Sequence, residues 1–236
     1  YFYNTILVQS PRFKDYLVNQ GVNEKKILFY PYYAESFYKV IEPNQKINKI
    51  FSKRLNIVFA GNIGVAQSFD TIINAVEIVS KKIDNFTVIV LGDGRDKKRI
   101  LDRINSLNLN SHFKFLGSFP PEKMSEFFAS ADALLVTLKK TKIFSMTIPG
   151  KLQSYLACGR PIIGSIDGIG AEIIKESSCG LVTPSEDYNG LAESIINFYN
   201  STEENRVKFG INARKYFEKE FARDKLLLKL IDIFNR

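Results

Sequence analysis

The residues with the clearest potential for chemistry lie in the stretch TKIFSMTIPGKLQSYLACGRPII, between Thr141 and Ile163. A helix is predicted to begin at Lys151 and to end at Gly159, before a new apolar strand. An irregular loop is predicted before that helix, and it carries Lys142, Thr147, Ile148, Pro149 and Gly150. Because a helix N-terminus presents unpaired N–H groups and a partial positive charge, this stretch predicts a site for a phosphate-like anion.

The charge of this region is of one sign. The span 133–166 contains no Asp or Glu and five basic residues, namely Lys139, Lys140, Lys142, Lys151 and Arg160. The whole chain carries a net charge of +8, but elsewhere basic and acidic residues interleave, as in RDKKR at 95–99, which is typical of a solvated helix face. A small anionic ligand or an anionic membrane surface therefore fits the region better than a long polyanion, and we expect no nucleic-acid partner.

Three glycine-containing turns are predicted to meet this basic loop, with the sequences GNIG at 61–64, GDG at 92–94 and GSF at 117–119. Each follows a predicted strand, and ligands of open parallel sheets bind outside the carboxyl ends of the strands. Glycine lets the backbone approach a ligand closely, although GNIG is equally consistent with an ordinary strand-to-helix turn. The GDG turn does not complete the motif G-x-G-x-x-G, because Lys97 occupies its last position, so a nicotinamide cofactor is not favoured.

Glycine turns, a basic loop and a helix N-terminus together suit a diphosphate. No Asp-x-Asp pair occurs in the chain, so lysines and backbone amides would neutralise that diphosphate, and we expect neither a metal ion nor another cofactor. Cys158 and Cys179 lack a metal-ligand spacing and lie in apolar surroundings, which favours buried free thiols in a cytoplasmic protein. His112, the only histidine, lies beside a predicted strand and is not expected to act as a catalytic base.

The hydrophobic pattern that must position these residues alternates between strands and helices. The strands of the main domain are expected at 55–60, 86–91, 113–116, 133–137, 161–164 and 180–183. The helices are expected at 68–82, 96–106, 121–130, 151–158, 171–177, 191–199 and 203–217. Strands joined by helical crossovers indicate an α/β fold, a Rossmann-like, doubly wound parallel sheet with helices on both faces.

The ends of the chain are expected to lie outside this domain. Residues 1–40 carry one predicted helix and one strand, too little for a domain, so we interpret them as the tail of a preceding, truncated domain. Residues 41–54 are a polar linker, and residues 55–218 form the main domain. Residues 219–236 are expected to form a C-terminal helix that returns toward the preceding domain.

Several segments occur in an order and spacing that resemble the C-terminal, donor-binding half of GT-B glycosyltransferases of family four. They read FAGNIGVAQSFDTIINA, VLGDG, FLGSFP, ASADALLVTLKK, TIPGKLQSYLACGRPII and CGLVTPSED. The resemblance covers nearly the whole chain, because ILVQSPRFKDYLVNQGVNEKKILFYPYY is similar to the end of the family's N-terminal domain. It extends to enzymes of bacterial capsule, O-antigen (lipopolysaccharide) and exopolysaccharide biosynthesis, including enzymes described as fucosamine transferases.

The resemblance implies a nucleotide-diphosphate sugar as donor, a UDP-sugar in the first place, with retention of the anomeric configuration and no required metal. By position it implies that the diphosphate and the donor sugar contact Gly61, Asn62, Gly64, Gln67, Lys142, Thr147, Ile148, Pro149, Gly150 and Lys151. It implies that the nucleoside contacts Gly92, Gly117 and Ser154, and that Glu172 lies at the rim of the site.

The chain departs from the family pattern at two pairs of positions. Many relatives carry an Arg and a Lys in the first glycine loop, where this chain has Asn62 and Gln67. The family's two glutamates fall on Met146 and Ser154, so both carboxylates are absent. We hypothesise that Lys151, together with Lys142, replaces the missing loop cations.

The function implied is transfer of a hexosyl or acetylhexosaminyl unit to a glycan or a lipid-linked acceptor, in the cytoplasm or at the inner face of the plasma membrane. Acceptor site and catalytic groups are expected in the N-terminal domain, so this chain alone is expected to bind the donor and to be inactive. Two alternatives are a non-catalytic nucleotide-sugar-binding subunit of a split glycosyltransferase and a UDP-sugar epimerase. The acid-free span 133–166 disfavours the epimerase, which needs acid and base groups.

Overall fold

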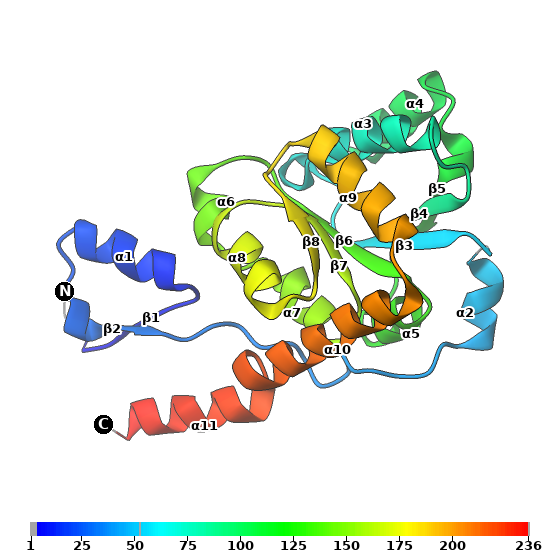
Figure 1. Cartoon of the computed structure of the whole chain (residues 1–236). Coiled ribbons are helices and arrows are strands. Elements are labelled where there is room, and N and C mark those ends of the chain that lie inside the picture. The colour runs from blue at the N-terminus through cyan, green and yellow to red at the C-terminus, as the bar shows by residue number, and fades with distance from the viewer. Residues whose placement is uncertain (1–3, 52, 236) are drawn as a thin grey trace.

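The protein is known from a computed structural model that describes residues 4–51 and 53–235 (Figure 1). Its main body is a sheet of six parallel strands in the order β5-β4-β3-β6-β7-β8. The strands are β3 (Leu55–Ala60), β4 (Phe86–Leu91), β5 (Phe113–Gly117), β6 (Ala133–Thr137), β7 (Ile162–Ser165) and β8 (Gly180–Thr183). This order reverses direction between β3 and β6, as in Rossmann-like folds, and the predicted fold class is confirmed.

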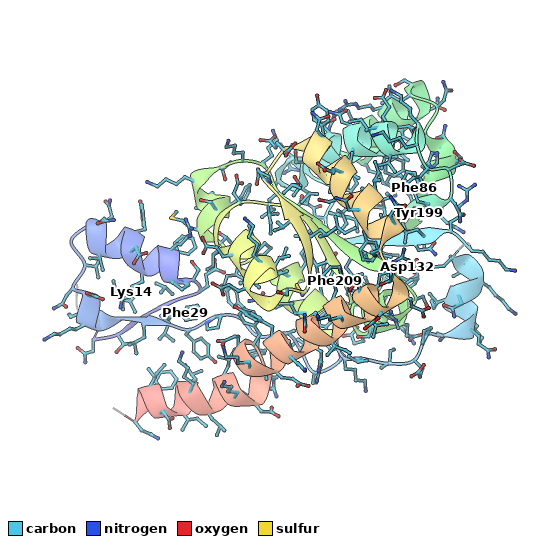
Figure 2. The ribbon with its side chains drawn as sticks, in the orientation of Figure 1. Lys14, Phe29, Phe86, Asp132, Tyr199 and Phe209 are labelled. Carbon is cyan, nitrogen blue, oxygen red and sulfur yellow. The ribbon has the colours of Figure 1, made fainter. Side chains whose placement is uncertain are left out.

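Helices cover both faces of the sheet, with their apolar sides inward (Figure 1). One face carries α3 (Phe69–Ser80), α4 (Lys97–Ser106) and α9 (Tyr188–Asn200). The other carries α5 (Met124–Ala129), α7 (Gly150–Ala157), α8 (Gly168–Ser177) and α10 (Glu203–Glu220). Figure 2 labels Phe86, a fully buried β4 residue that packs in the first of these two layers and stacks on His112.

The central strands are mostly apolar because both of their faces are covered, and Asn56 of β3 and Thr87 of β4 are buried polar exceptions. Every residue of β3 and β4 is buried. Successive side chains of a strand point to opposite faces, so Ile57 and Phe59 pack with α3 whereas Val58 and Ala60 pack with α5 and α7. The carboxyl ends of β3, β4 and β5 therefore meet at one edge of a closely packed, two-sided core.

A smaller layer precedes the main sheet. It consists of β1 (Ile6–Val8) and β2 (Ile27–Phe29), which pair in parallel, and of α1 (Pro11–Asn19) between them. The last helix, α11 (Arg223–Phe234), lies beside this layer, where Lys229 Nζ donates a hydrogen bond of 2.8 Å to the Phe29 carbonyl (Phe29 is labelled in Figure 2). Residues 1–3, 52 and 236, which belong to the predicted tail, linker and terminal helix, lie outside the described residues.

Two short helices occur where the sequence predicts irregular chain. The polar linker contains α2 (Gln45–Ile50), which begins at the N-cap Asn44 and packs Ile47 and Ile50 against the core. The loop that carries Lys142 contains α6 (Lys142–Met146), whose N-cap Thr141 accepts a hydrogen bond from the Phe144 N–H. Within residues 4–51 and 53–235, no helix combines the length and the apolar character needed to cross a bilayer.

Candidate functional site

A cavity of about 440 Å³, called the main cavity below, opens at the carboxyl edge of the main sheet. It lies beside the point where the strand order reverses, which is where open α/β sheets bind their ligands. Its walls come from the turns after β3, β4 and β5, from α5 and α7, and from the segment before α2. They comprise Tyr38, Ala60, Gly61, Asn62, Leu91, Gly92, Asp93, Ser118, Phe119, Pro121, Met124, Phe128, Gly150, Lys151, Ser154 and Tyr155.

Lys151 places a buried ammonium group at this cavity. Its Nζ has no hydrogen-bond partner among the described residues and lies 4.0 Å from the centre of the Phe59 ring. Phe59 faces away from α7, so the lysine reaches across the carboxyl edge of β3. Burial lowers the pKa of Lys151 to about 7 because the charged form loses its hydration. A buried cation that has no hydrogen-bond partner is poised for an anionic ligand.

Tyr155 fixes the position of α7 against β3. This side chain is 1% exposed, and its hydroxyl accepts a hydrogen bond of 3.0 Å from the Ala60 N–H. The same hydroxyl donates to the Ala60 carbonyl at 3.4 Å, so it satisfies both backbone hydrogen-bonding groups of the last residue of β3. Burial raises the pKa of Tyr155, which keeps the hydroxyl protonated. Lys151, one turn earlier on α7, is thereby held beside the turn that follows β3.

The N-terminus of α7 adds a second electropositive feature. Pro149 occupies the N-cap and makes no side-chain hydrogen bond there. The Leu152 N–H donates to the Pro149 carbonyl at 2.8 Å, so the N–H groups of Gly150 and Lys151 are the ones left for a ligand. Gly150 lines the cavity and is exposed. Ile148 is 2% exposed and belongs to the core, and Thr147 donates its hydroxyl hydrogen to the Ile143 carbonyl. These last two residues therefore shape the turn, whereas Gly150 and Lys151 face the cavity.

The glycines after β3 and β4 allow two backbones to touch. Gly61 has φ +135° and Gly92 has φ +148°, a region that side-chain-bearing residues avoid. A Cβ atom on Gly92 would stand 1.9 Å from the Gly61 carbonyl oxygen. A Cβ atom on Gly61 would stand 3.2 Å from Lys151 Nζ. Gly92 thus permits the turns to pack on each other, and Gly61 permits the lysine to lie against the backbone.

The remaining residues of the GNIG turn divide between the cavity and the interior of the turn. Asn62 lines the cavity. With its amide nitrogen directed inward, Gln67 donates to the carbonyls of Gly64 at 3.1 Å and Asn62 at 3.2 Å. Its backbone carbonyl accepts a hydrogen bond from the Thr137 hydroxyl at 2.5 Å. Gln67 and Gly64 therefore brace the turn and are not among the cavity-lining residues.

The opposite end of the cavity is apolar and aromatic. Phe119, Met124 and Phe128 line it, and Phe119 lies against Phe127 with ring centres 4.4 Å apart. Ser118 lines the same wall, while Gly117, at φ +81°, turns the chain just before it. A flat apolar group fits such a wall, with Phe119 exposed enough to stack on it.

Most of the basic residues of the span 133–166 point elsewhere. Lys142 is exposed and lies over the Tyr16 ring at 5.7 Å, next to a separate cavity. The backbone N–H of Lys140 donates to the Glu186 carboxylate, and the Arg160 side chain donates to the Ala129 carbonyl. Only Lys151 of the five lines the main cavity, so the structure does not bring Lys142 to it as hypothesised.

The two acidic residues near these cavities, Glu172 and Asp93, are each paired with a basic side chain. Glu172 forms an ion pair with Arg12 in a second cavity, of about 370 Å³, and so lies apart from the main cavity. Asp93 lines the main cavity but is paired with Lys97 at 2.9 Å, and the Lys97 hydrogen bond lowers the pKa of Asp93. Among the described residues, no group of three or more His, Cys, Asp or Glu could hold a metal ion.

The two thiols are buried and free as predicted, and the histidine is packed in the core. Cys158 and Cys179 are buried and free, and burial raises the pKa of each thiol to about 11. His112 is 5% exposed and stacks on Phe86 with ring centres 4.5 Å apart. These three residues are part of the core and lie outside the main cavity.

Sequence reasoning missed several wall residues. Phe119 is the last residue of the predicted GSF turn, and its position just after a strand was a usable signal. Tyr155 is one turn from Lys151, and its sequence position does not distinguish it from the core residues of the same predicted helix. Tyr38 gave no signal, because it belongs to a polar, irregular stretch far from the glycine turns in the chain.

A six-stranded parallel sheet with this strand order, and with a cationic cavity at its reversal point, defines a Rossmann-like α/β domain. Comparison with protein families matches residues 40–216 to the family "Glycosyl transferases group 1". The match covers most of the chain, so the chain belongs to this family.

Individual relatives agree with this assignment. An uncharacterized glycosyltransferase of Methanocaldococcus jannaschii is 27% identical over 178 residues, which are 75% of this chain and 47% of that protein. The N-acetyl-alpha-D-glucosaminyl L-malate synthase of Bacillus anthracis is 25% identical over 72% of this chain and 40% of that protein. The chain thus spans about half the length of the curated relatives it matches.

Solved structures share the fold. The Anabaena protein HepE, in complex with UDP and glucose, superposes with a TM-score of 0.81 at 16% identity, over 99% of this chain and 63% of that one. A glycosyltransferase from Rickettsia africae superposes with a TM-score of 0.83 at 16% identity, over 98% and 62% of the two chains. At these identities the likeness establishes the GT-B-like fold.

Proposed function

We propose that this chain binds the nucleotide-diphosphate sugar donor of a glycosyltransferase in the cavity at the carboxyl edge of its main sheet. The main support is the buried ammonium of Lys151, which has no hydrogen-bond partner among the described residues, beside the N-terminus of α7. A diphosphate would supply the missing partner for both features. The aromatic wall formed by Phe119, Met124 and Phe128 would receive the nucleobase.

The proposed donor is a UDP-sugar. HepE of Anabaena, which has the same fold, is described in complex with UDP and glucose, and this supports uridine as the base. The proposed reaction retains the anomeric configuration, needs no metal, and transfers a hexosyl or acetylhexosaminyl group to a glycan or a lipid-linked acceptor. As the bond to the sugar breaks, negative charge grows on the leaving diphosphate, and Lys151 and the α7 amides stabilise it in place.

This chain matches about half the length of its relatives, so we assign acceptor recognition to the whole protein. A role in capsule, O-antigen or other bacterial polysaccharide synthesis is part of the same proposal, as is contact with an anionic membrane surface. Cosedimentation with phosphatidylglycerol vesicles at 50 and 300 mM salt tests the membrane contact. We expect binding that is lost at the higher salt concentration, and no binding at either would exclude it.

The donor assignment is tested by titrating the chain with UDP, GDP and ADP in a calorimeter, once with EDTA and once with Mg²⁺. We expect UDP to bind most tightly and its affinity to be equal in the two conditions. Inorganic pyrophosphate should bind more weakly than UDP, because it cannot use the aromatic wall. If neither UDP nor pyrophosphate binds, the cavity is not a diphosphate site.

Binding of UDP is expected to take up about one proton at pH 8. Free Lys151, with a pKa of about 7, is then mostly neutral, and the bound diphosphate favours its ammonium form. Affinity should therefore fall as the pH rises above 7, by up to about tenfold per pH unit. Titrations in Tris and in phosphate-free HEPES, whose ionisation enthalpies differ, count the protons.

The matched control for this measurement is Lys142→Met, because Lys142 is exposed and lies outside the main cavity. That variant should take up the same number of protons as the unmodified chain. A binding enthalpy that is the same in both buffers would show that Lys151 is not the group that meets the diphosphate.

A further inference from the structure

The turn between α6 and α7 leads directly into the N-terminus of α7. It consists of residues 147–149 and is called the α6–α7 turn below. The Thr147 N–H donates back into α6, at 3.1 Å. The ring of Pro149 fixes its φ, at −63°, and the residue before a proline is restricted as well. The turn is therefore stiff, so a displacement at the end of α6 is passed on to Gly150 and Lys151.

Helix α8 of the main domain lies directly against α6 and this turn. Gly168, at φ +65°, begins α8, and a Cβ atom there would stand 1.9 Å from the Ser145 carbonyl oxygen of α6. A Cβ atom on Gly170 would stand 3.3 Å from the Cδ atom of Pro149. The backbone of α8 thus touches both α6 and the α6–α7 turn, which leaves the turn no room to move toward α8.

The smaller layer, formed by β1, α1 and β2, holds the end of α6 through Ser10. This residue is the N-cap of α1 and is 0% exposed. Its Oγ accepts a hydrogen bond of 3.3 Å from the Phe13 N–H and donates one to the Met146 carbonyl. Met146 is the last residue of α6, where a carbonyl has no partner within the helix. One buried hydroxyl therefore begins α1 and ends α6, immediately before the α6–α7 turn.

Two further contacts join α1 to the main domain, and both lie at the surface. Arg12 of α1 pairs with Glu172 of α8, and each of these side chains is 43% exposed. Lys142 of α6 lies over the exposed Tyr16 ring of α1, with Nζ 5.7 Å from the ring centre. Exposed ion pairs contribute little, whereas a buried carbonyl that loses its donor costs the desolvation of that group. Ser10 is therefore the contact with α1 on which the position of α6 depends most.

We propose that Ser10 is a positioning residue of the diphosphate site, acting through the Met146 carbonyl and the α6–α7 turn. It sets the direction of the Gly150 and Lys151 N–H groups. Ser10 does not line the main cavity, and it precedes residues 40–216, which the family match covers. Its contribution is preorganisation, because a helix N-terminus that is already in place has less order to gain when an anion binds. This inference rests on the proposed function, because it presupposes a diphosphate in the cavity.

The test measures the affinities of UDP and inorganic pyrophosphate for the unmodified chain, Ser10→Ala and Ser10→Thr by calorimetric titration. Ser10→Ala removes the bond to Met146, so it should bind both ligands less tightly, by roughly three- to tenfold. The factor should be the same for both, because the diphosphate is the group that the two ligands share. Ser10→Thr keeps the hydroxyl and should bind both ligands like the unmodified chain.

A second measurement follows the N-terminus of α7 itself. In ¹⁵N-labelled protein without ligand, the backbone amide resonances of Gly150 and Lys151 should shift in Ser10→Ala and stay in place in Ser10→Thr. A serine whose only role is to cap α1 would leave these two resonances unchanged in Ser10→Ala. Resonances that do not move would therefore contradict the proposal.

Two variants separate this role from the stability of the smaller layer. Asn23 is another N-cap, between α1 and β2, and its side chain accepts the Lys25 N–H at 3.0 Å. Asn23→Ala should leave both affinities unchanged. Glycine is nearly as favourable as serine at an N-cap but has no hydroxyl, so Ser10→Gly should bind pyrophosphate as weakly as Ser10→Ala. It also keeps the test decisive if Ser10→Ala does not fold.

The inference is overturned if Ser10→Ala and Ser10→Gly bind pyrophosphate as tightly as the unmodified chain, or if Asn23→Ala weakens binding as much as they do. Failure of the proposed function looks different, because then neither UDP nor pyrophosphate binds the unmodified chain. That result would overturn the diphosphate site and the role of Ser10 in it together.

Discussion

Replacing Lys151 with methionine is expected to weaken UDP binding by roughly ten- to a hundredfold. The ammonium is buried and has no hydrogen-bond partner among the described residues, so a diphosphate would gain a charge-assisted hydrogen bond in a water-poor setting. Methionine keeps the length and the apolar stem but removes the charge. Titration of both proteins with UDP and with pyrophosphate measures the effect, which should be similar for the two ligands.

The same substitution should stabilise the protein without ligand. In the unfolded chain a lysine has a pKa near 10.5, whereas in the fold Lys151 has a pKa of about 7. Between these pH values the unfolded state binds more protons, so the stability of the unmodified chain rises with pH. Since one pKa unit corresponds to about 1.4 kcal/mol, Lys151→Met should be more stable at pH 7 by on the order of a few kcal/mol.

Thermal unfolding at pH 6.5, 8 and 9.5 checks the sign of this effect. The advantage of Lys151→Met should be greatest at the lowest of these pH values and should shrink toward the highest. Lys142→Met, an exposed lysine, should change the melting temperature little at any of them. An advantage that grows with pH, or a loss of stability throughout, would contradict a buried unpaired ammonium.

Replacing Gly92 with alanine is expected to give the largest loss of stability among the turn glycines of the site, about 3 kcal/mol or more. Its φ of +148° disfavours any side chain, and the added Cβ would meet the Gly61 carbonyl oxygen at 1.9 Å. To relieve this contact the two turns must separate, which moves Gly61 away from Lys151. UDP binding should therefore fall together with stability.

Gly117→Ala is the control for Gly92→Ala. Gly117 also has a positive φ, of +81°, but a Cβ atom there would have no neighbour within 4 Å. The Gly117→Ala variant should lose about 1 kcal/mol of unfolding free energy, because only the backbone preference for glycine is lost. Urea unfolding of both variants separates the two causes, and equal losses would mean that the contact between the turns has no energetic consequence.

The predicted strands agree with the structure to within one residue at each end, because both faces of the sheet are covered. A strand buried on two sides is a continuous apolar run, and such runs, bounded by glycine and polar residues, stand out in the sequence. β7, expected at 161–164 and found at Ile162–Ser165, is typical. The long helices were also visible from their spacing, although α8 and α9 each begin three residues before their predicted starts at 171 and 191. One-turn helices such as α6 depend on a cap and a few contacts.

The candidate site was only partly predictable from the sequence. Residues that are close in sequence can lie at opposite edges of the sheet, depending on whether they precede or follow a strand. Arg160 precedes β7 and therefore lies at the amino edge, whereas Lys151 lies at the carboxyl edge. The one-signed charge of the span 133–166 is thus distributed over both ends of the sheet. Conversely, Tyr38 is distant in sequence, and only the fold brings it to the cavity wall, where its ring stacks on Phe128.

Helix α7 is held on two sides within two turns. Lys151 at the cavity and Tyr155 at the end of β3 lie on one side, and Gln153 donates to the Tyr32 carbonyl at 2.9 Å on another. A slide or rotation of the helix that improved one of these contacts would therefore break another. Mutations that change individual side chains can alter the specificity of this site, whereas insertions or deletions in the helix cannot, because one extra residue would turn every later contact by about 100°.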